Sequence, residues 1–114
     1  MAHEKYQDCI DACVDCATEC EHCATACLGE EDVKMMARCI QLDRDCARIC
    51  FTAAALMASD SPFASQICAL CADICEACAT ECEKHADHHD HCRQCAEACR
   101  KCAEACRKMA GTRA

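Results

Sequence analysis

Cysteines recur along this chain at alternating steps of four and three residues, the spacing of apolar positions on one face of a helix. From Cys9 to Cys27 the cysteines fall at positions 9, 13, 16, 20, 23 and 27. Residues three and four apart share one face of an α-helix, so this spacing predicts a helix with six thiols along one stripe. The same spacing returns at positions 68, 71, 75, 78 and 82, and again at 92, 95, 99, 102 and 106. Cysteine therefore holds the positions that leucine holds in an ordinary helix bundle.

The first half of the chain predicts two helices. The first covers about residues 4–28 and ends at Gly29, a residue suited to the left-handed position after a helix. The acidic run at 30–32 favours a second helix start through its charge against the helix dipole, and this helix reaches about Ala58. Its cysteines are Cys39, Cys46 and Cys50. Asp43 takes the in-phase place between Cys39 and Cys46, so the thiol stripe is interrupted there.

The second half predicts two more helices. Ser61 can cap a third helix, Pro62 suits its first turn, and the helix runs to about Lys84. Asp90 can cap a fourth helix, which ends near Met109. The third helix also carries a second apolar face, which we expect to pack against another helix or subunit: Ile67, Leu70 and Ile74.

Four helices with short connections predict an all-α fold, an antiparallel up-down-up-down four-helix bundle with a cysteine-lined core. We expect one domain over residues 1–114. This topology places the turn after Cys27 at the same end as the polar turn 84–91, which carries His85, His88, His89 and His91. The opposite end collects Met57, Phe63, the N-terminus and Met109, and we expect it to be plugged.

Composition changes this picture, because ordinary core residues are scarce. The chain has 13 Ile, Leu, Val and Phe residues against 19 Cys, with a formal net charge of -8. Such scarcity with such a charge ordinarily points towards disorder. Either the thiols pack as small hydrophobic groups, or a bound species supplies the missing cohesion.

Charge and hydropathy also limit the partners. The negative charge argues against nucleic acid, which attracts basic surfaces. The first residues carry charges where a signal peptide needs an apolar run, and no stretch is long enough to span a membrane. We therefore expect a cytoplasmic protein whose thiols stay reduced. Helical neighbours have Cβ atoms ~5 to 6 Å apart, too far for the ~3.5 to 4.5 Å of a disulfide.

Three interpretations of the thiols are disfavoured. Core filling does not require cysteine in phase across four helices. Redox catalysis normally uses one CxxC pair at a helix N-terminus, whereas the CxxC pairs here recur in mid-helix and face inward. Zinc and iron-sulfur sites usually take cysteines from loops, and zinc with four thiolates carries a net charge of minus two, which is costly to bury repeatedly.

Monovalent copper fits the pattern best. Thiolate and thioether are soft donors that select Cu(I), and one Cu(I) per thiolate is electrically neutral. A buried core can therefore hold about one ion per cysteine without accumulating charge. The pattern indicates capacity for many ions.

The chain also resembles the cysteine-rich four-helix-bundle copper storage proteins of bacteria, in particular their cytosolic branch. Besides the first thiol stripe, the resemblance is carried by CIQLDRDCARIC, by DSPF followed by ICALCADICEACATEC, and by HCRQCAEACRKCAEAC after the histidine-rich turn. It implies that the thiols point into the bundle and bind many Cu(I) ions. It also implies a homotetramer, with metal taken up at the histidine end.

The candidate metal ligands comprise the 19 cysteines, three histidines and one methionine. They are Cys9, Cys13, Cys16, Cys20, Cys23, Cys27, Cys39, Cys46, Cys50, Cys68, Cys71, Cys75, Cys78, Cys82, Cys92, Cys95, Cys99, Cys102, Cys106, His85, His89, His91 and Met36. His85 and His89 are in phase with the thiol stripes, and His91 can reach across the end of the bundle. His88 is an alternative to His89, and Met35 to Met36; a solvated polar turn is the alternative for the histidines as a group.

The sequence thus predicts cytosolic Cu(I) storage and detoxification, not an enzyme. The expected partners are copper ions and a copper chaperone or small thiol that donates them, with neither nucleic acid nor membrane. The alternative function is a metal sensor or chaperone that handles one or a few soft metal ions.

Overall fold

The fold consists of helices joined by short turns over residues 6–111, the part of the chain that the computed structural model describes. In this range the chain forms four α-helices and one short 3-10 helix, and no strand. They are α2 (Gln7–Leu28), η1 (Val33–Met36), α3 (Ala37–Ala58), α4 (Ala64–Glu83) and α5 (Asp90–Gly111). The predicted all-α fold class is confirmed; the expected helix start at residue 4 lies outside the described residues.

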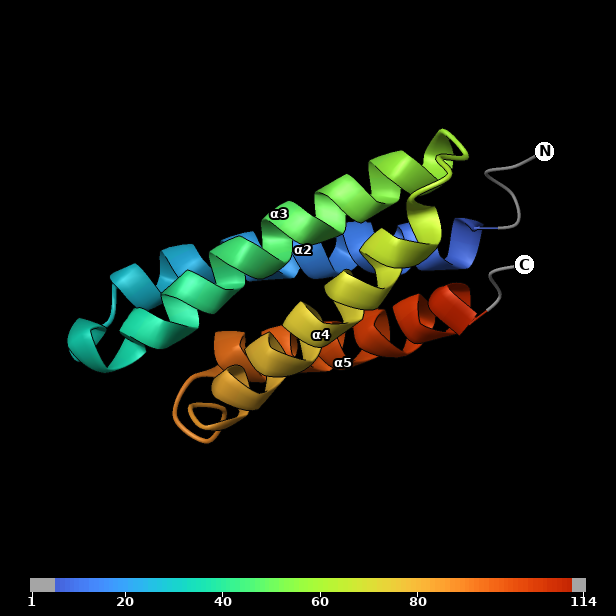
Figure 1. The fold of residues 1–114 in the computed structure, drawn as a ribbon. Coiled ribbons are helices and arrows are strands. Elements are labelled where there is room, and N and C mark those ends of the chain that lie inside the picture. Colours follow the sequence, from blue (N-terminus) through green and yellow to red (C-terminus); the bar gives the residue numbers. More distant parts are fainter. Residues whose placement is uncertain (1–5, 112–114) are drawn as a thin grey trace.

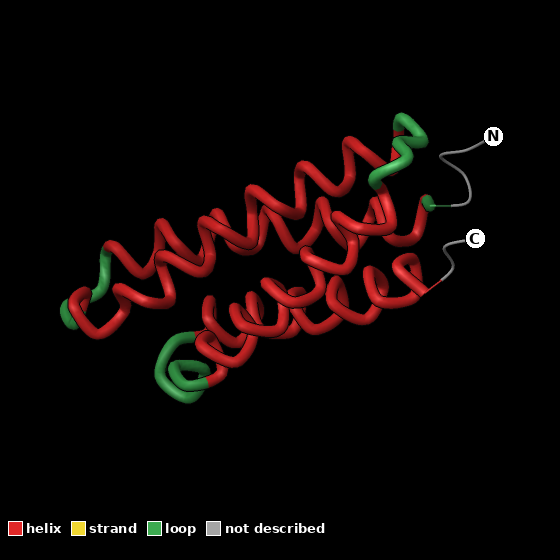
Figure 2. Tube along the Cα trace, in the orientation of Figure 1, coloured by secondary structure: helices red, strands yellow, loops and turns green. Residues whose placement is uncertain are grey.

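The helices form an antiparallel up-down-up-down bundle. Each packs against its neighbour in the chain, and α2 closes the arrangement by packing against α5. The bundle measures 47 × 18 × 17 Å. The connection from α2 to α3 and the connection from α4 to α5 lie at one end, on the left of Figure 1, whereas the α3–α4 turn, the start of α2 and the end of α5 lie at the other (Figures 1 and 2). We call the end with residues 29–36 and 84–89 the mouth.

At the mouth, the chain leaves α2 differently from what the sequence predicted. Gly29 has φ -88°, so the predicted left-handed position is wrong. The last turn of α2 instead tightens, with the amides of Gly29 and Glu30 donating to the carbonyls of Ala26 and Cys27. The next α-helix does not begin at the acidic run either. The 3-10 helix η1 intervenes, and α3 starts at Ala37.

At the far end, α4 begins later than predicted. Asp60 takes the left-handed conformation (φ 54°), and the amide of Phe63 donates to the side-chain oxygen of Ser61. Pro62 lies in the turn that this conformation and this hydrogen bond form, and α4 starts only at Ala64. The prediction of Pro62 within the first helical turn is therefore wrong. Phe63 is 63% exposed and does not plug this end, whereas Met57 is fully buried.

Cysteine forms the core of the bundle. All 19 cysteines are buried and none is in a disulfide. Small alanines fill the spaces beside them, as Ala17 does in α2 and Ala72 in α4. Ile67 and Ile74 pack against this core, whereas Leu70 is exposed. No helix of residues 6–111 combines the length and apolarity needed to cross a membrane.

Candidate metal centre

The sulfur atoms of facing helices lie in contact along the bundle axis. Cys39 and Cys82 bring their Sγ atoms to 3.4 Å, and Cys46 and Cys75 to 3.5 Å. These are contact distances, well beyond the ~2.05 Å of a disulfide bond. Contacts also cross the bundle diagonal, for example from Cys50 to Cys102 at 3.8 Å. Thiols from all four α-helices therefore meet on the axis.

These thiols form overlapping groups of four. In each group the four Sγ atoms lie within 4.8 Å of one another. Five such groups are Cys13/Cys71/Cys102/Cys106, Cys16/Cys46/Cys50/Cys75, Cys16/Cys20/Cys46/Cys99, Cys20/Cys78/Cys95/Cys99 and Cys23/Cys27/Cys39/Cys92. Three of the five share cysteines with one another. We call the whole array of thiols the sulfur column. Because groups in it share cysteines, a soft cation bound in one group lies next to the ligands of another.

The close packing divides the thiols into those that release a proton easily and those that hold it. Hydrogen bonds from Cys23 and Cys82 lower the pKa of the Cys39 thiol to about 4. Hydrogen bonding to Cys16 and Cys46, together with burial, raises the pKa of Cys20. A thiolate in the column is therefore stabilised by neighbours that keep their protons. A cation that binds several thiolates must displace those protons.

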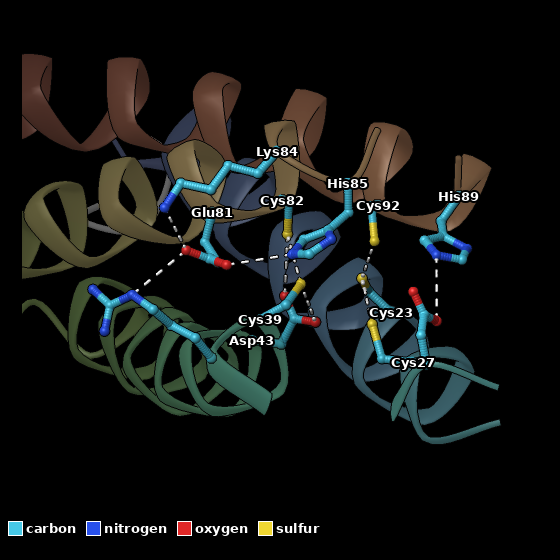
Figure 3. Close-up of polar contacts among 12 residues, drawn as sticks. Cys23, Cys27, Cys39, Asp43, Glu81, Cys82, Lys84, His85, His89 and Cys92 are labelled. Carbon is cyan, nitrogen blue, oxygen red and sulfur yellow. Dashed lines mark hydrogen bonds and ion pairs between the residues drawn. The ribbon is translucent and has the colours of Figure 1, made fainter. Parts of the chain in front are cut away.

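Asp43 is a carboxyl group buried inside the sulfur column. Its Oδ1 accepts hydrogen bonds from Cys78 at 3.2 Å and Cys95 at 3.3 Å. Its side chain also contacts Cys39 and Cys82, as Figure 3 shows. Burial, followed by the charges of Cys95 and Cys39, raises the pKa of Asp43 to about 9. The helical phase of Asp43, in step with Cys39 and Cys46, had indicated that its side chain faces the inside of the bundle. The sequence alone gave no indication that four thiols surround it.

Among the histidines of residues 6–111, His91 is the one whose ring nitrogen contacts cysteine thiols. Its Nδ1 lies 3.4 Å from Cys23 Sγ, 3.6 Å from Cys92 Sγ and 3.9 Å from Cys27 Sγ. Its side chain is 14% exposed, so one edge of the ring reaches the surface. The first residues of α5 place it there. Three sulfurs and one imidazole nitrogen thus converge beneath the mouth.

His85 and His89 contact carboxylates instead. His85 Nε2 lies 3.3 Å from Glu81 Oε2, and Glu81 also pairs with Lys84 and Arg38 (Figure 3). His89 Nδ1 pairs with the carboxylate of Glu30, which belongs to the other connection of the mouth. The predicted phase of His85 came from α4, which ends at Glu83, and that of His89 came from α5, which begins at Asp90. Both histidines lie in the connection between these helices, where neither helical phase extends.

The remaining candidates at the mouth separate by burial. Met36, the last residue of η1, is fully buried and belongs to the core, whereas Met35 is exposed. His88 is exposed. Met36 and His91 therefore face the interior, while Met35 and His88 face solvent.

Similarity to characterised proteins extends over almost the whole chain. The profile of the copper storage protein family matches residues 2–111. The Cu(I)-bound copper storage protein BsCsp3 of Bacillus subtilis is 58% identical, with a TM-score of 0.86 over 91% of this chain and 96% of that one. A cytosolic copper storage protein from Streptomyces lividans, in a structure of copper loading with five coppers, is 39% identical; its TM-score is 0.92 over 96% of this chain and 95% of that one.

A curated relative is similar over a shorter region. The cysteine-rich protein YhjQ of Bacillus subtilis is 57% identical over 70 residues, which are 60% of this chain and 65% of that protein. The aligned region therefore spans slightly less than two thirds of YhjQ. The TM-scores of the two solved structures agree with the helix bundle described above. This chain belongs to the copper storage protein family.

Proposed function

We propose that this protein stores Cu(I) in the cytosol and thereby limits copper toxicity. The observation that carries the proposal is the sulfur column, in which neighbouring groups of four thiols share members. Thiolate ligands select Cu(I), and one Cu(I) per thiolate leaves the buried column neutral. Repeated zinc sites would instead accumulate negative charge in a buried core.

Uptake takes place at the mouth. His91 Nδ1 and the sulfurs of Cys23, Cys27 and Cys92 form a mixed nitrogen and sulfur site within reach of solvent. Cys23, Cys27 and Cys92 also form a group of four with Cys39, so a Cu(I) ion received from a small thiol or a copper chaperone can pass inward by exchanging one ligand at a time. Each exchange passes a proton from the incoming thiol to the ligand that is released, and the thiols that additional Cu(I) ions occupy lose their protons to solvent. The other sequence-predicted ligands at the mouth are His85, His89 and Met36.

Several further features accompany this proposal. The family is one of storage, and the inward-facing thiols leave no route for a protein substrate, so we propose that the chain is not an enzyme. The Streptomyces relative is cytosolic, which supports the same compartment here. We also propose a homotetramer, with the exposed Val14 and Leu70 available for contacts between copies. The net charge of -8 opposes nucleic-acid binding.

A titration tests the storage function. Reduced, metal-free protein is titrated with Cu(I) in competition with a chromophoric chelator of known affinity. We expect binding to continue to about one Cu(I) per cysteine, as charge neutrality requires. Saturation at one to four equivalents would refute storage and would favour a sensor or a chaperone that handles a few ions.

A further inference from the structure

Glu30 joins the two connections of the mouth through one carboxylate. It lies in the turn after α2, and its side chain is 28% exposed. Its Oε2 pairs with His89 Nδ1 and lies 3.2 Å from His91 Nε2. Both histidines belong to the opposite side of the mouth, about 60 residues away in the sequence. A single acidic side chain therefore holds two imidazole rings.

This contact determines which nitrogen of His91 faces the sulfur column. A neutral imidazole has one nitrogen that donates and one that accepts. Because a carboxylate can only accept, Nε2 of His91 carries the proton and donates it to Glu30. The lone pair of Nδ1 then points towards Cys23 and Cys92. Without an acceptor at Nε2, the Nδ1 atom could instead carry the proton and donate it to a neighbouring sulfur.

His89 restricts the His91 ring further. The centroids of the two rings are 5.4 Å apart, with the planes tilted by 31°. His89 is itself held by Glu30 and lies 3.9 Å from Asp32. The carboxylate and the second ring together limit rotation of His91. In metal sites, a carboxylate commonly orients a histidine ligand by accepting a hydrogen bond from the ring nitrogen that does not bind the metal. Glu30 and His91 have this arrangement.

We propose that Glu30 is a positioning residue for copper uptake: it keeps His91 in the orientation and tautomer whose Nδ1 can bind Cu(I) together with Cys23, Cys27 and Cys92. This inference rests on the proposed storage function, since it assigns a role to the residue behind the uptake ligand. Removing such a carboxylate typically costs 10- to 100-fold in metal affinity or activity. The sulfur column itself does not depend on Glu30.

Two measurements on four variants test the role of Glu30. The variants are Glu30→Ala, Glu30→Gln, His91→Ala and the double variant Glu30→Ala/His91→Ala. Glu31→Ala is the matched control, because it removes the same charge from an exposed position in the same turn. The first measurement is the histidine ¹⁵N spectrum of the reduced, metal-free protein. The second is the initial rate of loading from a Cu(I)–glutathione complex, followed by stopped-flow absorbance.

In the ¹⁵N spectrum we expect wild-type His91 to be protonated at Nε2 alone. Glu30→Ala should give a mixture in which part of the His91 rings are protonated at Nδ1. Its loading rate should fall about tenfold or more. Glu31→Ala should match the wild type in both measurements, and Glu30→Gln should lose less, because its amide oxygen still accepts from one ring. In the His91→Ala background, Glu30→Ala should have no further effect on the rate.

Three results would overturn the role of Glu30. The first is an unchanged His91 spectrum in Glu30→Ala. The second is an equal loss of rate in Glu30→Ala and Glu31→Ala, which would show that Glu30 only attracts cations by its charge. The third is an additive loss in the double variant. Because each variant retains all 19 thiols, its Cu(I) capacity at saturation tests the storage function separately.

Discussion

Replacing Asp43 with asparagine should remove a pH dependence from the stability of the metal-free bundle. The wild-type carboxyl group has a pKa of about 9 in the folded protein, because it is buried and lies beside the charges of Cys95 and Cys39. In the unfolded chain an aspartate titrates near 3.9. Between these two values the folded protein binds one more proton at this site than the unfolded chain does. Stability therefore falls as the pH rises through this window.

The size of the effect follows from the slope of about 1.4 kcal/mol per pH unit for one proton. From pH 5 to pH 8 the wild type should lose about 4 kcal/mol relative to Asp43→Asn. Asparagine has nearly the same shape, and its Oδ1 can still accept from Cys78 and Cys95. The unpaired amide hydrogens of asparagine shift its stability by about 1 to 3 kcal/mol at every pH. This offset leaves the difference in slope unchanged.

Urea unfolding measures this difference directly. The reduced, metal-free proteins are unfolded at pH 5, 6, 7 and 8, and the free energy of unfolding is plotted against pH. Asp45→Asn is the control, because Asp45 lies on the same helix but its side chain is 41% exposed. Thiol titration is common to all three proteins and largely cancels in the comparison. If the wild-type and Asp43→Asn curves run parallel, Asp43 does not retain its proton up to a pKa of about 9 in the folded protein.

Four further predictions concern the thiols and the mouth. His91→Ala should slow Cu(I) uptake about tenfold or more in stopped-flow measurements, at least as much as Glu30→Ala does, and leave the capacity nearly unchanged; a loss of most of the capacity would contradict a separate uptake site. Saturating Cu(I) should raise the free energy of unfolding by about 3 kcal/mol or more once free Cu(I) exceeds its Kd 100-fold; equal calorimetric midpoints with and without copper would argue against this coupling. Acidification should release Cu(I) to a chelator, because protons compete for thiolates. Cys16→Ser should lower the capacity by about one or two ions, since Cys16 belongs to two groups of four; an unchanged endpoint would show that Cys16 is not a ligand.

The sequence by itself determined the helices, their inward faces and the bundle. These depend on the spacing of cysteines within one helix, and the helical period of 3.6 residues converts that spacing into a shared face. The shared face of the cysteines from Cys9 to Cys27, for example, could be predicted from that segment alone. Short connections then left an antiparallel bundle as the arrangement that buries all four stripes. The choice of Cu(I) followed from the chemistry of the donors alone.

Only the tertiary structure decided the surroundings of residues whose partners come from distant segments. Helical phase placed Asp43 on the inner face, but the packing of α3 against α4 and α5 sets its four thiol contacts. At the mouth the sequence named His85, His89 and His91 as candidates alike, and the tertiary structure places His91 against the thiols but His85 and His89 against carboxylates. The physical reason is that a helix transmits a regular period along its own length, and a connection does not. The contact between Glu30 and His91 exists only because two turns, far apart in the sequence, meet at one end of the bundle.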